Sequence, residues 1–356
     1  MCAFTHLRVH SHYTFLGGMA SVGELARRAA ADGMSHLALT DVNGLYGAVT
    51  FASACREAGV HPIIGMAATV AMDQDLAVGS DDAQSPGSLV LLATGLLGYR
   101  SLCRLSSLVQ GHPDREACAA RGLDLDDLRT YCDGLICLSG GRRGWIERAL
   151  RAGHRQAAQR FAGRLVGIYG PDSVYLSLEL HRPEDEAVAR QVVALGESLG
   201  LPPVAVQPVY CLSPEDVPYL KLLKAIDLNC SLEQVTDAVL PDGGDPGVTV
   251  HWLDPAEMTV RFSAFPEALE RSGEIAARCG PALPDGNPIW PVIDLPEGRT
   301  ADQALADLAR AGLEERYGSD PSPDVRQRLE RELGAIARYG YAPLFLVVAD
   351  VVRFAH

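Results

Sequence analysis

The chain has 356 residues, which is the length of two ordinary domains or of one large α/β barrel with an additional segment. Hydrophobic residues make up 47% and charged residues 21%, a globular composition that excludes a largely disordered protein. The formal net charge of −14 excludes a protein that binds nucleic acid by charge over its whole surface, because neutralising phosphates needs a cationic surface.

Two classes of feature are missing from the sequence. No run of about 18 apolar residues is present, and the first residues lack a secretory signal, so we expect no membrane segment and no membrane partner. The nine cysteines form no C-x-x-C pair, which argues against a disulfide framework or a cysteine-based zinc site. These features predict a cytoplasmic protein.

Short apolar segments alternate with helical segments through the first 210 residues. The predicted strands lie near 7–9, 37–39, 62–65, 88–93, 134–138, 174–180 and 203–206. The predicted helices lie near 21–31, 46–58, 97–109, 124–131, 144–151, 154–168 and 184–199. Ser21 and Glu24 form a capping box at the first helix, and Gly59 ends the second. About seven parallel βα units favour a barrel, and a doubly wound sheet is the alternative.

The composition changes after residue 230. Residues 231–300 are rich in turn formers and predict a loop-rich linker after a barrel domain of residues 1–230. Three helices are predicted within 301–356, and the last is apolar on most faces, as in a helix buried inside a larger body. We therefore expect residues 301–356 to be the truncated start of a further, mainly helical domain.

The pattern His10-Ser11-His12 follows the first predicted strand. Residues two apart on a strand face the same side, so both imidazoles are expected to project together at the carboxyl end of a barrel strand. Asp41 closes the second strand and adds a carboxylate, and this set suits Zn²⁺, Mn²⁺ or iron. The pair Glu179 and His181 is the next candidate addition. The alternative is a polar strand end with solvated histidines.

A cluster of three aspartates, at 124–127, is a weaker candidate for a metal site. Asp124, Asp126 and Asp127 stand at the start of a predicted helix, where carboxylates interact favourably with the helix dipole. This interaction makes the three residues poor candidates for a two-metal carboxylate site.

A basic stretch runs from Arg142 to Arg164 and contains only one acidic residue, Glu147. On an acidic protein such a stretch predicts a local positive face that contacts DNA phosphates or an acidic partner, and two solvated helix surfaces are the alternative. The candidate residues of this face are Arg142, Arg143, Arg148, Arg151 and Arg155.

Several longer motifs resemble a known family. LRVHSHYTFLGG at 7–18, ALTDVNGLYGAV at 38–49 and AGVHPIIGM at 58–66 are similar to the PHP domain at the start of bacterial C-family DNA polymerases. That group comprises the DNA polymerase III alpha subunit and its error-prone relative. The resemblance continues in GYRSLCRLSSL at 98–108 and RYGYAPLFLVVADVVRFA at 338–355. The sequence of these motifs is more similar to the error-prone branch.

The resemblance implies a distorted (βα)7 barrel, of α/β class, with a metal cluster at its strand ends, followed by a mainly helical segment. His10, His12 and Asp41 match ligand positions of the family. Other ligand positions are occupied here by Val42, Ala67, Pro183 and the segment Gln207–Tyr210. The resemblance therefore implies at most a weak zinc or manganese site, and Mg²⁺ is expected only in a polymerase core that lies outside this chain.

These observations predict the N-terminal region of a polymerase III alpha-like DNA polymerase, acting with DNA and with other replication or repair proteins. The barrel is predicted to be a non-catalytic structural or partner-binding module. One alternative is a metal-dependent phosphoesterase or 3′–5′ exonuclease that uses His10, His12 and Asp41. Another is a stand-alone interaction module without a polymerase.

Overall fold

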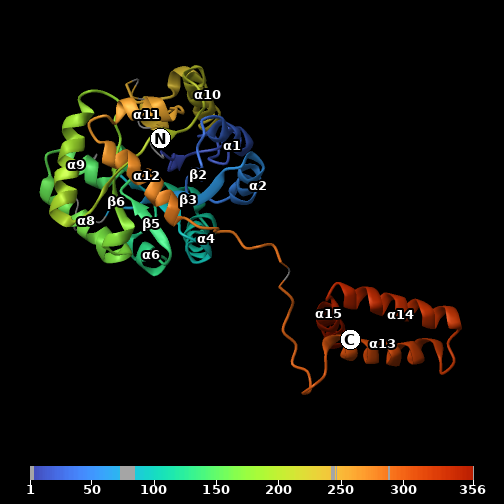
Figure 1. Cartoon of the computed structure of the whole chain (residues 1–356). Coiled ribbons are helices and arrows are strands. Elements are labelled where there is room, and N and C mark those ends of the chain that lie inside the picture. Colours follow the sequence, from blue (N-terminus) through green and yellow to red (C-terminus); the bar gives the residue numbers. More distant parts are fainter. Residues whose placement is uncertain (1–3, 73–84, 242–244, 246, 288, 356) are drawn as a thin grey trace. The chain divides into compact units, whose positions relative to one another are not determined.

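The structure is a computed structural model that describes residues 4–72, 85–241, 245, 247–287 and 289–355. It divides into two compact units, Met1–Leu283 and Pro284–His356, which are described separately here. The first unit is built on a curled sheet surrounded by helices, and the second is helical (Figure 1). The predicted α/β class, with a helical segment after the barrel, is confirmed.

The described residues of the first unit contain eight strands, six in one sheet and two in a short second sheet. They are β1 (Arg8–Val9), β2 (His36–Leu39), β3 (His61–Val70), β4 (Gly87–Ala93), β5 (Leu135–Leu138), β6 (Val174–Leu178), β7 (Pro203–Ala205) and β8 (Pro208–Val209). Strands β2 to β7 are hydrogen-bonded neighbours in chain order, and β1 pairs with β8. Since β7 and β8 are two parts of one strand interrupted at Val206 and Gln207, the sheet curls back towards its start. The backbone of β1 also meets β2, where Thr40 N donates to Val9 O at 2.8 Å.

The expectation of uniformly parallel strands is wrong at β4. The first half of β3 pairs with β2 in parallel, but residues 65–70 pair with β4 antiparallel, and β4 also runs antiparallel to β5. An apolar strand buried on both faces has the same composition in either direction, so the sequence pattern does not report strand direction. The result is a mixed sheet and a distorted barrel.

Helices cover the outside of this sheet (Figure 1). Those of the first unit are α1 (Val22–Ala31), α2 (Ala48–Ala58), α4 (Leu96–Gln110), α5 (Arg115–Arg121), α6 (Leu125–Thr130), α7 (Trp145–Arg151), α8 (Arg155–Tyr169), α9 (Asp185–Leu199), α10 (Val217–Asp227), α11 (Pro255–Arg261) and α12 (Pro266–Arg278). The capping box of Ser21 and Glu24 is confirmed, and Gly59 ends α2 in the left-handed conformation. Helices α5, α10, α11 and α12 were not predicted.

The barrel interior is apolar and is closed at one end by α12. Side chains from the strands, among them Ile63, Leu92 and Ile136, form one buried cluster with Ile275 and Cys279 of α12. Arg278 Nη1 donates to Asp172 O at 2.8 Å, just before β6, so α12 lies at the amino-terminal end of the parallel strands.

The segment predicted as a loop-rich linker belongs largely to the first unit. Residues 231–300 contain α11 and α12, and the first unit extends to Leu283 instead of residue 230. Prolines and glycines in this segment suggested loops, but Pro266 stands in the first turn of α12, where a missing N–H costs nothing. Part of the segment, residues 242–244, 246 and 288, lies outside the described residues.

The second unit contains three helices in its described part, as predicted. They are α13 (Ala301–Tyr317), α14 (Pro323–Arg338) and α15 (Ala342–Ala355), and Thr300 caps α13. The apolar side chains of α15, including Phe345 and Val351, are exposed within this unit. Within the described ranges no single helix is long and apolar enough to cross a membrane, although α14 and α15, bent by 115°, pass a test of length and composition as a pair.

Candidate functional site

A buried ion pair lies at the end of the barrel where the parallel strands finish. Arg8 of β1 reaches across the barrel, and its Nη1 donates to Glu179 Oε1, just after β6, at 2.8 Å. Their side chains are 3% and 0% exposed. Gly141 leaves room for this carboxylate, because a Cβ built there would clash with the Glu179 side chain. The inside of the barrel mouth thus holds a fixed guanidinium.

The carboxylate of Glu179 has a second neighbour, His181. His181 Nε2 lies 3.6 Å from Glu179 Oε2, while its Nδ1 accepts the backbone N–H of Thr249 at 3.2 Å. Burial by itself would raise the pKa of Glu179, but Arg8 and His181 outweigh it and lower the pKa below its usual range. The structure brings together the predicted pair Glu179 and His181. The positive charge beside this pair is the Arg8 guanidinium.

His10 is buried beside this pair. Its ring stacks on Tyr210 with centroids 4.2 Å apart, and Arg8 Nη2 also reaches the Tyr210 hydroxyl at 3.4 Å. Neither ring nitrogen of His10 has a hydrogen-bond partner among the described residues. Burial, with the Arg8 charge adding to it, lowers the pKa of His10 well below its usual range. His10 is therefore a neutral, packed side chain that shares its environment with Arg8.

His12 does not accompany His10. Strand β1 ends at Val9, and the chain then enters a turn, so the two-residue alternation of a strand does not extend to His12. His12 is exposed, and its Nδ1 lies 3.3 Å from the carbonyl oxygen of Ala20. The predicted same-face pair is instead Arg8 and His10, which sequence reasoning missed because arginine is not a metal ligand.

Asp41 holds a loop in place. One carboxylate oxygen accepts the backbone N–H of Ser11 and the hydroxyl of Thr14, each at 2.7 Å, and the other accepts the Ser11 hydroxyl at 2.9 Å. Burial raises the pKa of Asp41, and these hydrogen bonds partly offset that effect. The hydrogen bonds occupy lone pairs that a metal ion would need.

The residues present do not fit the metal that the resemblance implies. Across the described ranges, no group of three or more histidine, cysteine, aspartate or glutamate side chains could hold a metal ion. His10 is stacked in the core, His12 is exposed, and Asp41 is used by three hydrogen bonds to a loop. A guanidinium stands beside the remaining carboxylate, Glu179. We therefore derive no chemistry that passes through a metal ion.

Two of the five predicted patch arginines are neutralised by carboxylates. Arg142 lies 3.1 Å from Asp185, and Arg151 lies 2.8 Å from the same oxygen and 2.7 Å from Glu147. Arg142 also approaches Asp245 at 3.4 Å. Sequence counting missed these pairs because Asp185 and Asp245 come from distant parts of the chain.

The other three arginines have different surroundings. Arg148 stacks over the Trp145 ring at 4.6 Å and donates to the carbonyls of Ser85 and Pro86. Arg143 and Arg155 are exposed. The continuous positive face predicted from the sequence is thus reduced, and its exposed members lie on different elements.

A wide hollow of about 950 Å³ opens over the barrel mouth. The loops after β1 and β2 and the helices α5 and α10 contribute its walls. Its lining includes aromatic and cationic side chains: Tyr13, Phe15, Tyr46, Arg115, Arg143 and Lys224. Phe15 is 80% exposed and Tyr46 60% exposed, so two aromatic side chains of one hollow are open to solvent.

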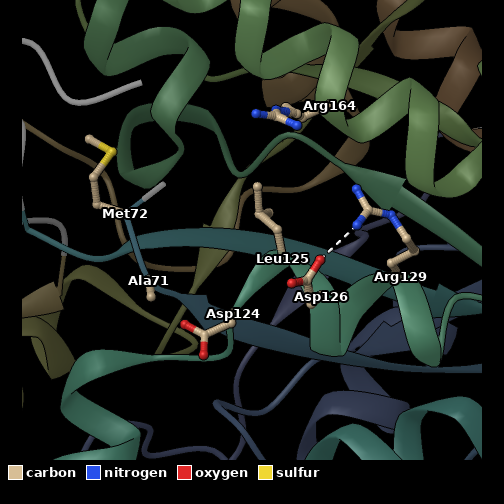
Figure 2. A pocket seen from close by; sticks show the side chains of 7 residues that line it. All are labelled: Ala71, Met72, Asp124, Leu125, Asp126, Arg129 and Arg164. Carbon is tan, nitrogen blue, oxygen red and sulfur yellow. Dashed lines mark hydrogen bonds and ion pairs between the residues drawn. The ribbon is translucent and has the colours of Figure 1, made fainter. Parts of the chain in front are cut away.

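A smaller polar hollow of about 300 Å³ lies at the start of α6 (Figure 2). Arg129 and Asp126 point towards each other there and are 2.6 Å apart. The predicted helix does begin here, and Asp124 and Asp127 form a capping box at its first turn. Asp124, Asp126, Asp127 and Arg129 thus interact with one another at the start of α6.

Comparison with known protein families identifies both units. Residues 6–181 match the PHP domain, and residues 303–356 match the bacterial DNA polymerase III alpha NTPase domain. The chain contains a PHP domain. The buried Arg8–Glu179 pair and the hollow above it therefore belong to the mouth of a PHP barrel.

Whole-chain relatives of this PHP protein carry polymerase names. It is 34% identical to the DNA polymerase III subunit alpha of Bacillus subtilis, over 99% of this chain and 30% of the relative. It is 35% identical to the error-prone DNA polymerase of Symbiobacterium thermophilum, over 99% of this chain and 32% of the relative. Both names occur at similar identity, so the predicted error-prone branch stays a prediction.

The PHP chain spans about 30% of the length of these curated relatives. Among solved structures it resembles an amidohydrolase from Chromobacterium violaceum, with 14% identity and a TM-score of 0.39, over 58% of this chain and 88% of that one.

Proposed function

We propose that this chain is the N-terminal region of a polymerase III alpha-like DNA polymerase, of the error-prone branch, and that it acts in the cytoplasm in replication or repair synthesis. The similarity over 99% of the chain to relatives named as such polymerases supports this proposal. We place a PHP barrel first, then a connecting segment, then the first helices of the polymerase core. DNA and other replication proteins are the proposed partners.

We further propose that the PHP barrel is non-catalytic and that its metal site is degraded. The observation that carries this proposal is the Arg8–Glu179 ion pair, buried at the mouth of the barrel. A divalent cation beside Glu179 would be repelled by the guanidinium at short range in a poorly screened environment. The guanidinium already supplies the positive charge that this buried carboxylate requires.

Asp41 supports the same conclusion. Its carboxylate accepts hydrogen bonds from Ser11 and Thr14, and binding a metal would break them. The role of the barrel would then be to stabilise the polymerase core and to offer a surface to partners.

Metal analysis and a nuclease assay test this proposal. We expect the purified chain, dialysed against Zn²⁺ or Mn²⁺, to retain far less than one metal ion per molecule and to leave DNA oligonucleotides intact. Stoichiometric metal, with hydrolysis that His10→Ala abolishes, would establish the alternative function, a metal-dependent phosphoesterase or 3′–5′ exonuclease.

The polymerase part of the proposal has a separate test. We expect the reading frame to continue past codon 356 into a domain with the paired carboxylates that hold Mg²⁺ in a polymerase core. A stop codon directly after His356 would favour a stand-alone interaction module.

A further inference from the structure

We propose that the hollow over the barrel mouth binds single-stranded nucleic acid without cutting it. This inference rests on the proposed function, since it assumes a barrel that does not hydrolyse what it holds. Proteins that bind single strands without base specificity combine exposed aromatic rings, on which bases stack, with cations that follow the phosphates. The hollow shows both kinds of side chain.

The first argument is the way in which Phe15 is presented. Phe15 lies in a tight turn in which the N–H groups of Gly17 and Gly18 both donate to Thr14 O, at 2.8 and 2.9 Å. Thr14 is itself fixed by Asp41, and Leu16 adopts a φ of +51°, a left-handed conformation that is strained for a residue other than glycine. The fold thus accepts backbone strain in a rigid turn whose phenyl ring is 80% exposed.

The second loop of the hollow is held equally firmly. Asn43, which has a φ of +51°, receives hydrogen bonds on its carbonyl from Ser106 at 3.2 Å and Gln110 at 3.0 Å. Its side chain bonds to Thr69 through both amide atoms. Tyr46 follows in this loop with 60% of its surface exposed. Two aromatic rings therefore line one hollow from two anchored loops, so little conformational entropy is lost when a base stacks on them.

The third argument is charge. Arg115 and Arg143 line the hollow and are exposed, and neither forms an ion pair with a described residue. Lys224 adds a third cation, although it also pairs with Asp227 at 2.8 Å, and Glu116 is the one carboxylate among the described residues of the lining. On a chain of net charge −14, unpaired cations around aromatic rings favour an anionic, base-bearing ligand.

Binding can be measured directly with the 356-residue chain. We expect the fluorescence anisotropy of a labelled oligothymidylate of about 16 nucleotides to rise with protein concentration at about 50 mM salt. Phe15→Ala is expected to raise the Kd about tenfold, because one stacked base is lost. Arg143→Ala is expected to make the salt dependence shallower by about 0.7 in the log–log slope, as for one phosphate contact to a single strand.

Matched variants show whether the hollow is responsible. Val260→Ala truncates an exposed apolar residue of α11, and Arg160→Ala removes an exposed arginine of α8, both outside the hollow. Both are expected to bind like the wild type. The proposal is overturned if the oligonucleotide does not bind, if the control variants weaken binding as much as Phe15→Ala and Arg143→Ala do, or if polyglutamate of equal charge competes as well as unlabelled oligothymidylate. The last result would assign the hollow to an acidic protein.

The same samples separate this inference from the proposed function. Oligonucleotide that binds and is then cut in Mn²⁺ would refute the non-catalytic barrel and, with it, the claim of holding without cutting. Intact oligonucleotide with no binding would refute the inference alone.

Discussion

Arg8 and Glu179 stand 171 positions apart in the sequence, yet their side chains meet at 2.8 Å inside the barrel, almost completely shielded from solvent. Each of them compensates the charge of the other in a place where an unpaired charge would be very unfavourable. The pair also links β1 to the end of β6, which lies two strands away in the curled sheet because β8 pairs with β1 and β7 pairs with β6.

The first prediction concerns this pair. Arg8→Met leaves the Glu179 carboxylate buried without its partner, so we expect a loss of about 3–5 kcal/mol in the free energy of unfolding. Arg8→Met combined with Glu179→Gln is expected to cost clearly less than the sum of the single changes. Urea unfolding of the four proteins measures this coupling. The surface pair Arg190 and Glu186 is the matched control and should show a coupling of about 0–1 kcal/mol. Additive losses at Arg8 and Glu179 would contradict the prediction.

A second prediction concerns Asp41. Asp41→Ala leaves the Ser11 N–H and the hydroxyl of Thr14 without an acceptor, and we expect it to lower the free energy of unfolding by about 3 kcal/mol or more. Because Phe15 lies in the loop that Asp41 anchors, proteolysis within 11–18 is expected to accelerate. Ser21→Ala, which removes the nearby cap of α1, is the control and should cost about 1 kcal/mol without exposing that loop. Equal proteolysis of both variants would show that Asp41 does not anchor the loop.

The third prediction distinguishes a packed histidine from a metal ligand. His10→Phe keeps a ring against Tyr210 and removes two buried nitrogens that lack described partners, so stability should be unchanged or higher. His10→Ala should cost about 2–4 kcal/mol, because it leaves a cavity. The pKa of His10 is lowered on folding, so the unfolded state takes up a proton first as the pH falls below 6.5, and wild-type stability drops there. The advantage of the phenylalanine variant in thermal unfolding should therefore grow from pH 8 to pH 5. A large loss in His10→Phe at pH 8 would contradict this interpretation.

The fourth prediction concerns Glu147 on α7. Burial, with the nearby Glu179 charge adding to it, raises the pKa of Glu147 from 4.5 to about 7, while Arg151 opposes the shift. The folded state then holds a proton that the unfolded state releases between these values, so this group contributes stability at low pH that is lost as the pH rises through 7. Glu147→Gln should weaken the loss of thermal stability between pH 5 and pH 8. Glu197→Gln, at an exposed position of α9, should follow the wild type. A Glu147→Gln curve parallel to the wild type would refute the prediction.

Local chemistry in the sequence determined most strands and helices up to α9, and it indicated the family. Ser21 and Glu24 cap α1 as their spacing predicts, and Gly59 ends α2, because these interactions involve only neighbouring residues. Alternating strands and helices indicated the barrel, and motifs such as LRVHSHYTF indicated the PHP domain, which the comparison confirmed. The predicted direction of β4 was wrong, because an apolar run does not indicate in which direction a strand runs.

The character of the barrel mouth was decided only by the tertiary structure. The sequence pattern paired His10 with His12, but the chain turns after Val9, so Arg8 and His10 share the interior. Arg142 and Arg151 were predicted as surface cations, yet both form ion pairs with Asp185 of α9. Proline and glycine suggested a linker where α12 closes the barrel. The physical reason is the same each time: charge compensation and burial depend on which distant segments the fold brings together, and residue spacing along one segment does not contain that information.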